Sequence, residues 1–245
     1  MFIYVINITF IFFHDFNRID YPARIVINGA LNAESIYSKR NSKSKYLLGG
    51  KYQTIRKEFW DVKILKKHSD IKNVLITFGG NDSRNLTPKV MELINKHNPE
   101  IIKNVIIGNS FTNTDAINKT TDSNTNLILN PKADQISQLM LEADLAICGA
   151  GQTLYELART KTPTVFVGIA ENQRNNIKSW ANFPYFSFAG WWNTKDIIGR
   201  LHQSFIKFDD NFEQIAEEIY SSNFIIDGSG SKNIVEEVLS YVRTK

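Results

Sequence analysis

The chain has 245 residues, of which 42% are hydrophobic and 22% charged, a composition typical of a globular protein with one or two domains. Its formal net charge of +4 comes from scattered lysines and arginines, which argues against a nucleic-acid surface and suits an anionic small substrate. A lone cysteine, Cys148, excludes an internal disulfide and indicates a cytoplasmic protein. We expect its thiol to be buried as a packing group.

The N-terminal segment, residues 1–13, is apolar but does not have the features of a targeting signal. It lacks a basic start and a cleavage site, and it is too short to span a bilayer. β-branched and aromatic residues dominate it, so it is predicted to form a buried strand. No other stretch approaches transmembrane length, and we therefore expect no stable membrane insertion.

From residue 74 onward, short apolar runs alternate with amphipathic segments. This alternation predicts an α/β fold with a doubly wound parallel sheet, whose strands are covered by helices on both faces. The expected strands are 74–78, 105–107, 127–129, 145–147 and 164–167, and the expected helices are 87–96, 135–142, 153–161, 195–205, 212–221 and 232–243.

A charged stretch at residues 60–72 suggests a boundary between two domains. Residues 66–245 are long enough for one complete Rossmann-like domain. Residues 1–65 supply only a strand or two, a loop and a short helix, and are interpreted as the remnant of a second such domain.

Three polar or glycine-rich loops follow predicted strands: residues 79–83, 149–153 and 171–173. In open α/β sheets, ligands bind beyond the carboxyl ends of the strands, so these loops are expected to line one site. Asp82 or Ser83 is expected to cap the helix that follows the first loop.

The second loop opens onto a predicted helix N-terminus, where free N–H groups attract an anion. Glu156, one turn further on, suits ribose hydroxyls, so the pattern suggests a nucleotide site. The alternative is a capping-box pair of Thr153 and Glu156. There is no P-loop, no GxGxxG motif and no metal-ligand spacing among the histidines, and we expect neither a metal nor a cofactor.

A dense aromatic segment spans residues 180–192 (WANFPYFSFAGWW). Such a cluster is expected to pack in the interior. The alternative is that part of it forms the wall of a sugar cleft.

Several segments, in order, match one protein family. Residues 46–52 (YLLGGKY) and 55–59 (IRKEF) resemble its LLGPxYxxLRxEF pattern, and 74–86 (VLITFGGNDSRNL) resembles VTFGGSDxxNLT. Residues 143–156 resemble ADLAIsAgGsTlyE, and NQ, GWW and DGSG recur at 172–173, 190–192 and 227–230. The chain thus resembles the UDP-2,4-diacetamido-2,4,6-trideoxy-altropyranose hydrolases of pseudaminic acid biosynthesis, which look like GT-B glycosyltransferases.

The resemblance implies that the chain is a UDP-sugar hydrolase, releasing UDP and a free diacetamido-trideoxyhexose. It places Gly151, Gln152 and Thr153 at the diphosphate and Glu156 at the ribose. It also implies further positions for the uracil (Leu129, Asn130), the cleft wall (Gly79, Gly80, Asn81) and the sugar or phosphate (Asn172, Gln173), with Asn172 as the one catalytic candidate.

One family motif is absent from the sequence: the early GxGHxxR segment, whose histidine looks like the general base. Residues 1–17 resemble a later strand of the family's first domain, and His14 aligns elsewhere. The alternatives are therefore a catalytically incomplete nucleotide-sugar-binding module, half of a split enzyme whose N-terminal domain comes from a separate chain, or a GT-B glycosyltransferase.

Overall fold

The computed structural model describes residues 9–13, 24–40, 43–65, 69–223 and 226–243. The chain divides into two compact units, one of residues 1–55 and 225–245 and the other of residues 56–224. This division differs from the predicted domains mainly at the C-terminus, because the last helix packs its apolar residues on the sheet of the first unit. That the first unit is a remnant of a Rossmann-like domain stays a prediction.

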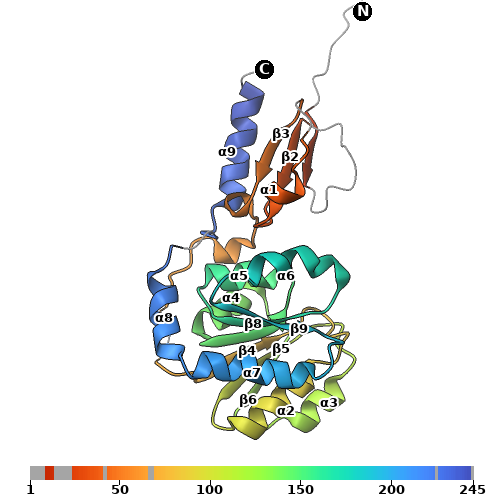
Figure 1. Ribbon diagram of the computed structural model, residues 1–245, viewed down its shortest axis with the longest axis vertical. Helices are drawn as coiled ribbons and strands as arrows, with labels where there is room; N and C mark the ends of the chain where they lie inside the picture. Colours follow the sequence, from red (N-terminus) through yellow and green to blue (C-terminus); the bar gives the residue numbers. More distant parts are fainter. Residues whose placement is uncertain (1–8, 14–23, 41–42, 66–68, 224–225, 244–245) are drawn as a thin grey trace, which may run out of the picture. The chain divides into compact units, whose positions relative to one another are not determined.

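Six parallel strands form the sheet of the second unit, in the order β6-β5-β4-β7-β8-β9 (Figure 1). The direction of winding reverses at β4, which lies between β5 and β7, as in doubly wound folds. The predicted α/β fold class is confirmed. The strands are β4 (Asn73–Thr77), β5 (Ile102–Ile107), β6 (Thr125–Leu129), β7 (Leu145–Gly149), β8 (Thr164–Gly168) and β9 (Phe186–Trp191).

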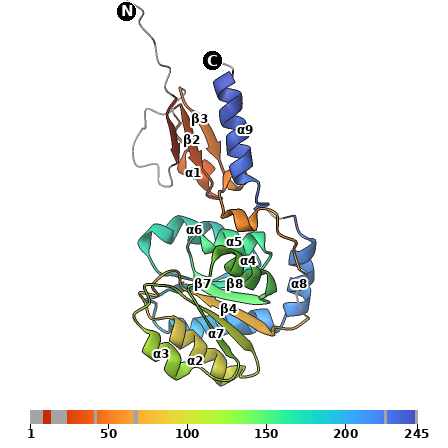
Figure 2. The same cartoon turned by 180° about the vertical axis from the view of Figure 1, so that it is seen from behind.

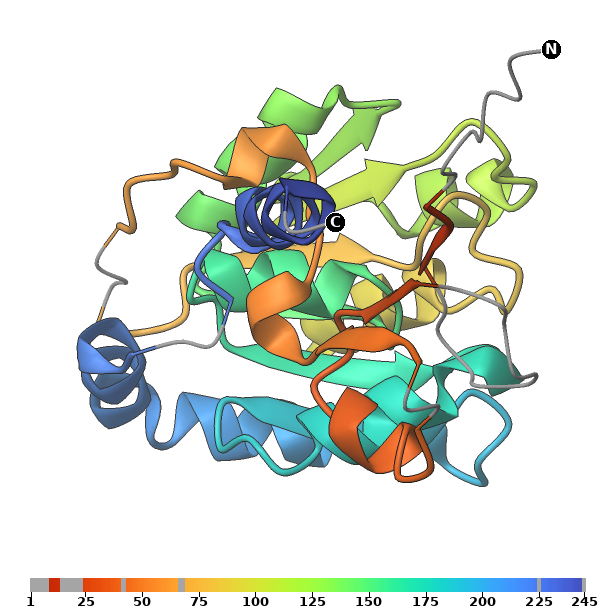
Figure 3. The same ribbon diagram turned by 90° about the horizontal axis from the view of Figure 1, so that it is seen from above.

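Helices cover both faces of this sheet. One face carries α2 (Thr87–His97), α3 (Thr114–Thr120) and α7 (Ile197–Asp209), and the other carries α4 (Ala133–Glu142), α5 (Thr153–Arg159) and α6 (Arg174–Trp180) (Figures 1 and 2). A further helix, α8 (Phe212–Ser221), follows α7 (Figure 3). The sequence pattern does not predict α3 and α6, because these short, asparagine-containing helices bury few apolar residues.

Double-sided burial explains the apolar runs of the central strands. Every residue of β7 and of β8 is buried, as expected for parallel strands between two helical layers. Cys148 on β7 has no exposed surface, so the expected packing role is confirmed. Burial raises the pKa of its thiol, which keeps it in the unreactive protonated form.

The first unit contains a three-stranded parallel sheet in the order β1-β2-β3. Side chains of β2 alternate between its faces: Ile25 and Ile27 pack with α9, and Val26 packs with α1. Helix α9 is seen end-on in Figure 3. The elements are β1 (Ile11–Phe13), β2 (Ile25–Asn28), α1 (Ala33–Ile36), β3 (Lys45–Leu48), the 3-10 turn η1 (Gly50–Tyr52) and α9 (Gly230–Arg243).

The prediction of a buried N-terminal strand is wrong for its described part. Ile11 and Phe13 of β1 are 38% and 65% exposed, and only Phe12 packs against the core. The reason is that β1 pairs with β2 alone among the described strands, so one face and one edge lack cover. Residues 1–8 and His14 lie outside the described residues. No helix among the described residues is long and apolar enough to cross a membrane.

One buried ion pair allows a test of the packing in the second unit. The fully buried Lys103 of β5 donates from Nζ to Asp122 Oδ2 at 2.9 Å and to the Ile101 carbonyl at 3.1 Å. Asp122→Ala would leave the cation buried without its counter-charge, and should lower the free energy of unfolding by about 3 kcal/mol. Lys103→Met removes the charge but keeps the volume, and should change it by less than about 1 kcal/mol.

Urea titration of the two variants measures both values, with Asp61→Ala, an exposed aspartate, as the control. Equal destabilisation by Asp122→Ala and Lys103→Met would contradict this account. It would mean that Asp122 does not stabilise the fold by neutralising the charge of Lys103.

Candidate functional site

The three loops predicted to line a site do emerge at one edge of the sheet. They follow β4, β7 and β8, which are parallel neighbours, so their carboxyl ends meet on the same side. The third loop forms a short 3-10 turn, η3 (Glu171–Gln173), before α6. We call this side the carboxyl edge of the sheet. It is the position at which doubly wound proteins hold their ligands.

A cavity of about 320 Å³ opens at the carboxyl edge, beside β4 and β5. It combines backbone-rich loops with one buried carboxylate and one arginine, whereas its apolar lining comes from β5 and α4. Its lining residues are Arg56, Thr77, Gly79, Gly80, Ile106, Gly108, Asn109, Asn130, Pro131, Ile136, Met140, Thr153 and Glu156.

Close backbone approach shapes the loop after β4. A Cβ atom on Gly108 would lie 2.5 Å from the carbonyl oxygen of Gly80, so only glycine allows the loops after β4 and β5 to touch. Gly79 has φ of +79°, a conformation that glycine adopts without strain. The bare backbone of this loop therefore faces the cavity.

Asp82 fixes the far end of the same loop, as predicted. Its buried carboxylate accepts hydrogen bonds from the backbone N–H groups of Leu86 and Thr87, both at 2.9 Å, and from Nδ2 of Asn113 at 2.8 Å. The carboxylate thereby caps α2 and links two loops of the carboxyl edge. Asp82 itself has a positive φ of +38°, which these bonds hold in place.

Glu156 on α5 is held by a partner that the sequence analysis did not assign. Arg56 donates from Nε to Oε1 at 2.6 Å and from a terminal nitrogen to Oε2 at 2.8 Å, a bidentate ion pair. The hydrogen bond with Glu156 is the main cause of a raised pKa at Arg56. The side chain of Glu156 is only 5% exposed, against 40% for Arg56. The capping-box alternative is not observed, since Glu156 faces Arg56 and no side chain caps α5.

The remaining predicted residues divide into those that line the cavity and those that do not. Gly79, Gly80, Asn130, Thr153 and Glu156 line it together. Gln173 lies nearby on the β8 side, where its Oε1 accepts from the backbone N–H of Ile169 at 2.9 Å and its amide approaches Gly151. Outside the lining are Asn81, Leu129, Gly151, Gln152, Asn172 and Gln173.

Four of the predicted residues outside the cavity lining are exposed: Asn81, Leu129, Gln152 and Asn172. Leu129 is 67% exposed at the end of β6, and Asn172 is exposed on η3. The roles predicted for these residues stay predictions.

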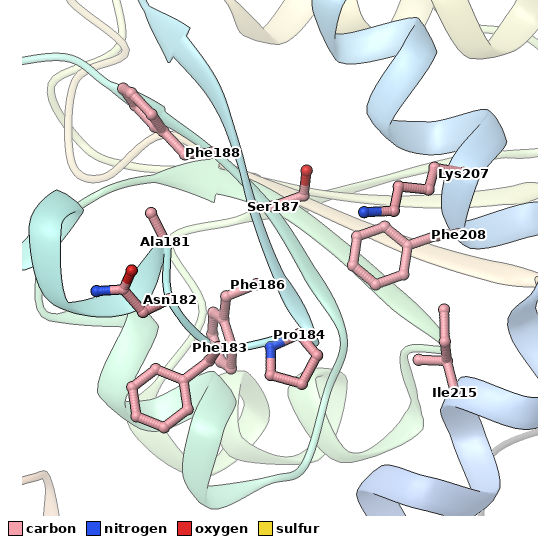
Figure 4. A pocket seen from close by; sticks show the side chains of 10 residues that line it. All are labelled: Ala181, Asn182, Phe183, Pro184, Phe186, Ser187, Phe188, Lys207, Phe208 and Ile215. Atoms are coloured by element: carbon pink, nitrogen blue, oxygen red, sulfur yellow. The ribbon is translucent and has the colours of Figure 1, made fainter.

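A second cavity, of about 440 Å³, lies elsewhere in the unit and is lined by part of the aromatic segment (Figure 4). Phe183, Pro184 and Phe186 meet Lys207 and Phe208 of α7 there. Phe186 begins β9, so this cavity lies toward the amino ends of the strands, away from the carboxyl edge. Within the aromatic segment, Trp180 and Phe186 are buried, Trp191 is half-buried and Trp192 is 36% exposed, so only part of the segment packs in the interior. No group of three or more metal-ligand side chains is found among the described residues.

Comparison with known proteins adds sequence relatives. No protein-family model matches the chain. Over 163 residues, it is 34% identical to the pseudaminic acid cytidylyltransferase and UDP-2,4-diacetamido-2,4,6-trideoxy-beta-L-altropyranose hydrolase of Helicobacter pylori, covering 66% of this chain and 29% of that protein. The two proteins are related. An uncharacterized protein of Methanocaldococcus jannaschii is 32% identical over 162 residues, covering 62% of this chain and 34% of its own length.

The chain therefore spans about a third of the length of the curated relatives it matches. Among solved structures, a complex of Staphylococcus aureus MnaA with UDP superposes with a TM-score of 0.64 at 13% identity, covering 90% of this chain and 60% of that one. At this identity the likeness concerns the fold, and it agrees with the GT-B-like architecture.

The Arg56–Glu156 pair predicts an asymmetric response to mutation. Arg56→Met leaves a buried carboxylate without its cation and should lower the free energy of unfolding by about 2–3 kcal/mol. Glu156→Gln leaves a half-exposed guanidinium that can turn to water, and should cost about 1 kcal/mol or less. Urea unfolding distinguishes the two, with Lys89→Met on the exposed side of α2 as the control. A larger loss for Glu156→Gln would refute this account of the pair.

Proposed function

We propose that this chain binds a UDP-sugar at the carboxyl edge and hydrolyses it, releasing UDP and a free diacetamido-trideoxyhexose in pseudaminic or a related nonulosonic acid biosynthesis. The observation that carries the proposal is the cavity that joins Gly79, Gly80, Asn130, Thr153 and Glu156. The 34% identity to a protein with this hydrolase in its name supports the choice of nucleotide and reaction.

In this proposal the nucleoside occupies the cavity. The uracil lies by the backbone of Leu129 and Asn130, and the glycines of the loop after β4 leave room for the ribose and diphosphate. Glu156 accepts hydrogen bonds from the ribose: each carboxylate oxygen has two lone pairs, and Arg56 uses one on each. Arg56 thus orients the carboxylate for the ligand.

The diphosphate lies at the loop between β7 and α5, against the backbone of Gly151 and Gln152 and the hydroxyl of Thr153. The sugar then extends toward Asn172 and Gln173. Hydrolysis breaks the bond between the anomeric carbon and the UDP oxygen, a water oxygen bonds to that carbon, and a proton leaves the water. The step needs a proton acceptor near the water and donors that stabilise the departing UDP.

A nucleotide-sugar-binding module without turnover is the second candidate, and one observation favours it. Among the described residues that line the cavity, Glu156 is the only carboxylate, and it is already paired with Arg56. Asn172 carries an amide, which can orient a water but cannot accept its proton at neutral pH. A GT-B glycosyltransferase, or half of a split enzyme, would use the same nucleotide site.

Binding of UDP tests the shared part of these candidates. Glu156→Ala should weaken UDP binding by about 1–3 kcal/mol, the cost of losing charged hydrogen bonds to the ribose. Isothermal titration calorimetry measures this, and Glu92→Ala, which removes an exposed carboxylate from α2, should leave the affinity unchanged. Unchanged affinity in Glu156→Ala would refute the ribose role.

Turnover separates hydrolase from binding module. The chain is incubated with the UDP-diacetamido-trideoxyhexose and UDP release is followed against a heat-killed control. Release without an added acceptor supports the hydrolase, and release only with a sugar acceptor supports a transferase. UDP binding without any release would overturn both and leave the binding module.

A further inference from the structure

Arg84 is the residue of the carboxyl edge whose contacts the proposed function does not use. It lies in the loop between β4 and α2, five positions beyond Gly79, and is half-buried. Its Nε donates to the carbonyl oxygen of Ile169 at 3.2 Å, just after β8. Its guanidinium carbon lies 4.1 Å from the ring centroid of Trp192, just after β9, and so stacks on the indole. Three loops therefore meet at this side chain.

The charge of Arg84 has no counter-charge in the described part of the chain. No carboxylate there forms an ion pair with it, whereas the neighbouring Arg174, over Trp191, is neutralised by Glu171. A guanidinium has five N–H donors, and within the described ranges only the one on Nε of Arg84 forms a hydrogen bond. The carbonyl and the indole hold the group in one orientation, so its remaining donors are available to a ligand.

Arg84 lies where the sugar of a bound nucleotide sugar would be expected, at the end away from the nucleoside. The cavity for the nucleoside lies over β4 and β5, whereas Arg84 contacts segments after β8 and β9, on the other side of β7. Ile169, which Arg84 contacts, donates from its backbone N–H to Gln173. The side chain of Ile169 packs on Gly149, where the loop proposed to hold the diphosphate begins. A ligand that runs from the cavity past this loop would reach Arg84 with its sugar.

We propose that Arg84, held on Trp192, is a specificity-determining residue that binds an acceptor group on the sugar, distal to the diphosphate. This inference rests on the proposed function, since it assumes a nucleotide sugar in the site. A guanidinium donates hydrogen bonds and accepts none. Its N–H donors lie in one plane and match a ligand group whose oxygen acceptors also lie in one plane. The shared chemistry is therefore a carbonyl-type oxygen, supplied by a carboxylate or by an acylamino substituent. Trp192, 36% exposed, forms the wall behind it.

Calorimetry with four ligands tests the assignment: UDP, UDP-glucose, UDP-N-acetylglucosamine and UDP-glucuronate. Arg84→Gln should leave the dissociation constants of UDP and UDP-glucose within about two-fold. It should raise that of at least one of the other two by about ten-fold or more, the scale of a lost charged hydrogen bond. A loss only with the glucuronate identifies a carboxylate, and a loss only with the N-acetyl sugar identifies an acylamino group. Arg200→Gln, an exposed arginine on α7, is the control.

Two further measurements separate recognition from folding. The melting temperature of Arg84→Gln is compared with that of the parent chain. If that variant does not fold, Arg84→Lys is used instead, because it keeps the positive charge but lacks the planar guanidinium. Arg84→Lys should lose affinity selectively for the UDP-sugar that carries the recognised acceptor group. Equal losses for all four ligands, or none for any, would overturn the assignment and leave the proposed function intact. Failure of UDP itself to bind the parent chain would instead overturn the proposed function and, with it, this inference.

Discussion

The six strands of the second unit all run in one direction, and this constraint decides where polar chemistry can occur. Helices bury both faces of the central strands, and every residue of β7 and β8 is inaccessible. Polar side chains and free backbone groups can therefore gather only where the strands end. Because the winding reverses at β4, the loops after β5 and β6 lie on one side of that point and those after β7 and β8 on the other. A long ligand can cross from one set to the other.

The sequence predicts the parts of this arrangement that depend on local pattern. Continuous apolar runs identify five of the six strands, and glycines at their ends identify the loops. The pattern fails where stability comes from tertiary contacts. Strand β9 contains Phe186 and Phe188, whose aromatic partners lie on α6 and β8, and α6 follows a polar turn with little periodicity. Strand β1 has the composition of a buried strand, but composition does not specify which strand lies at an edge.

In the candidate site, too, local sequence pattern identifies some residues, whereas tertiary contacts determine the partners of others. Glu156 can be identified from the sequence because it lies one turn into a helix that begins at a glycine-containing loop. Arg56 cannot be paired with it, because 100 residues separate the two and no local pattern connects them. Arg84 lies in a recognisable loop, yet its significance depends on Ile169 and Trp192, which the fold alone brings to it. Recognition of a family motif locates such residues without revealing their partners.

The two arginines at this edge have different electrostatic states, and that difference bears on function. Arg56 is neutralised by a nearly buried carboxylate, so the pair adds little net charge and mainly fixes the shape of the cavity. Arg84 forms no ion pair with the described residues, and its partners there are a carbonyl oxygen and an aromatic ring. Half-buried and stacked on the indole, the guanidinium of Arg84 remains accessible to water, and its terminal N–H donors can exchange that water for an acceptor on a ligand.

Recognition and turnover make separate demands on this edge. In the proposed function the nucleotide needs a cavity, bare backbone and a ribose acceptor, and the residues proposed for these roles meet around β4 and α5. Activation of water needs a proton acceptor within hydrogen-bond reach of the water that attacks the anomeric carbon. Both oxygens of Glu156 accept from Arg56, and a proton taken up by this carboxylate would remove the negative charge on which the ion pair depends. Under the proposed function Glu156 therefore binds the ligand, and a proton acceptor for hydrolysis would have to come from outside the cavity lining.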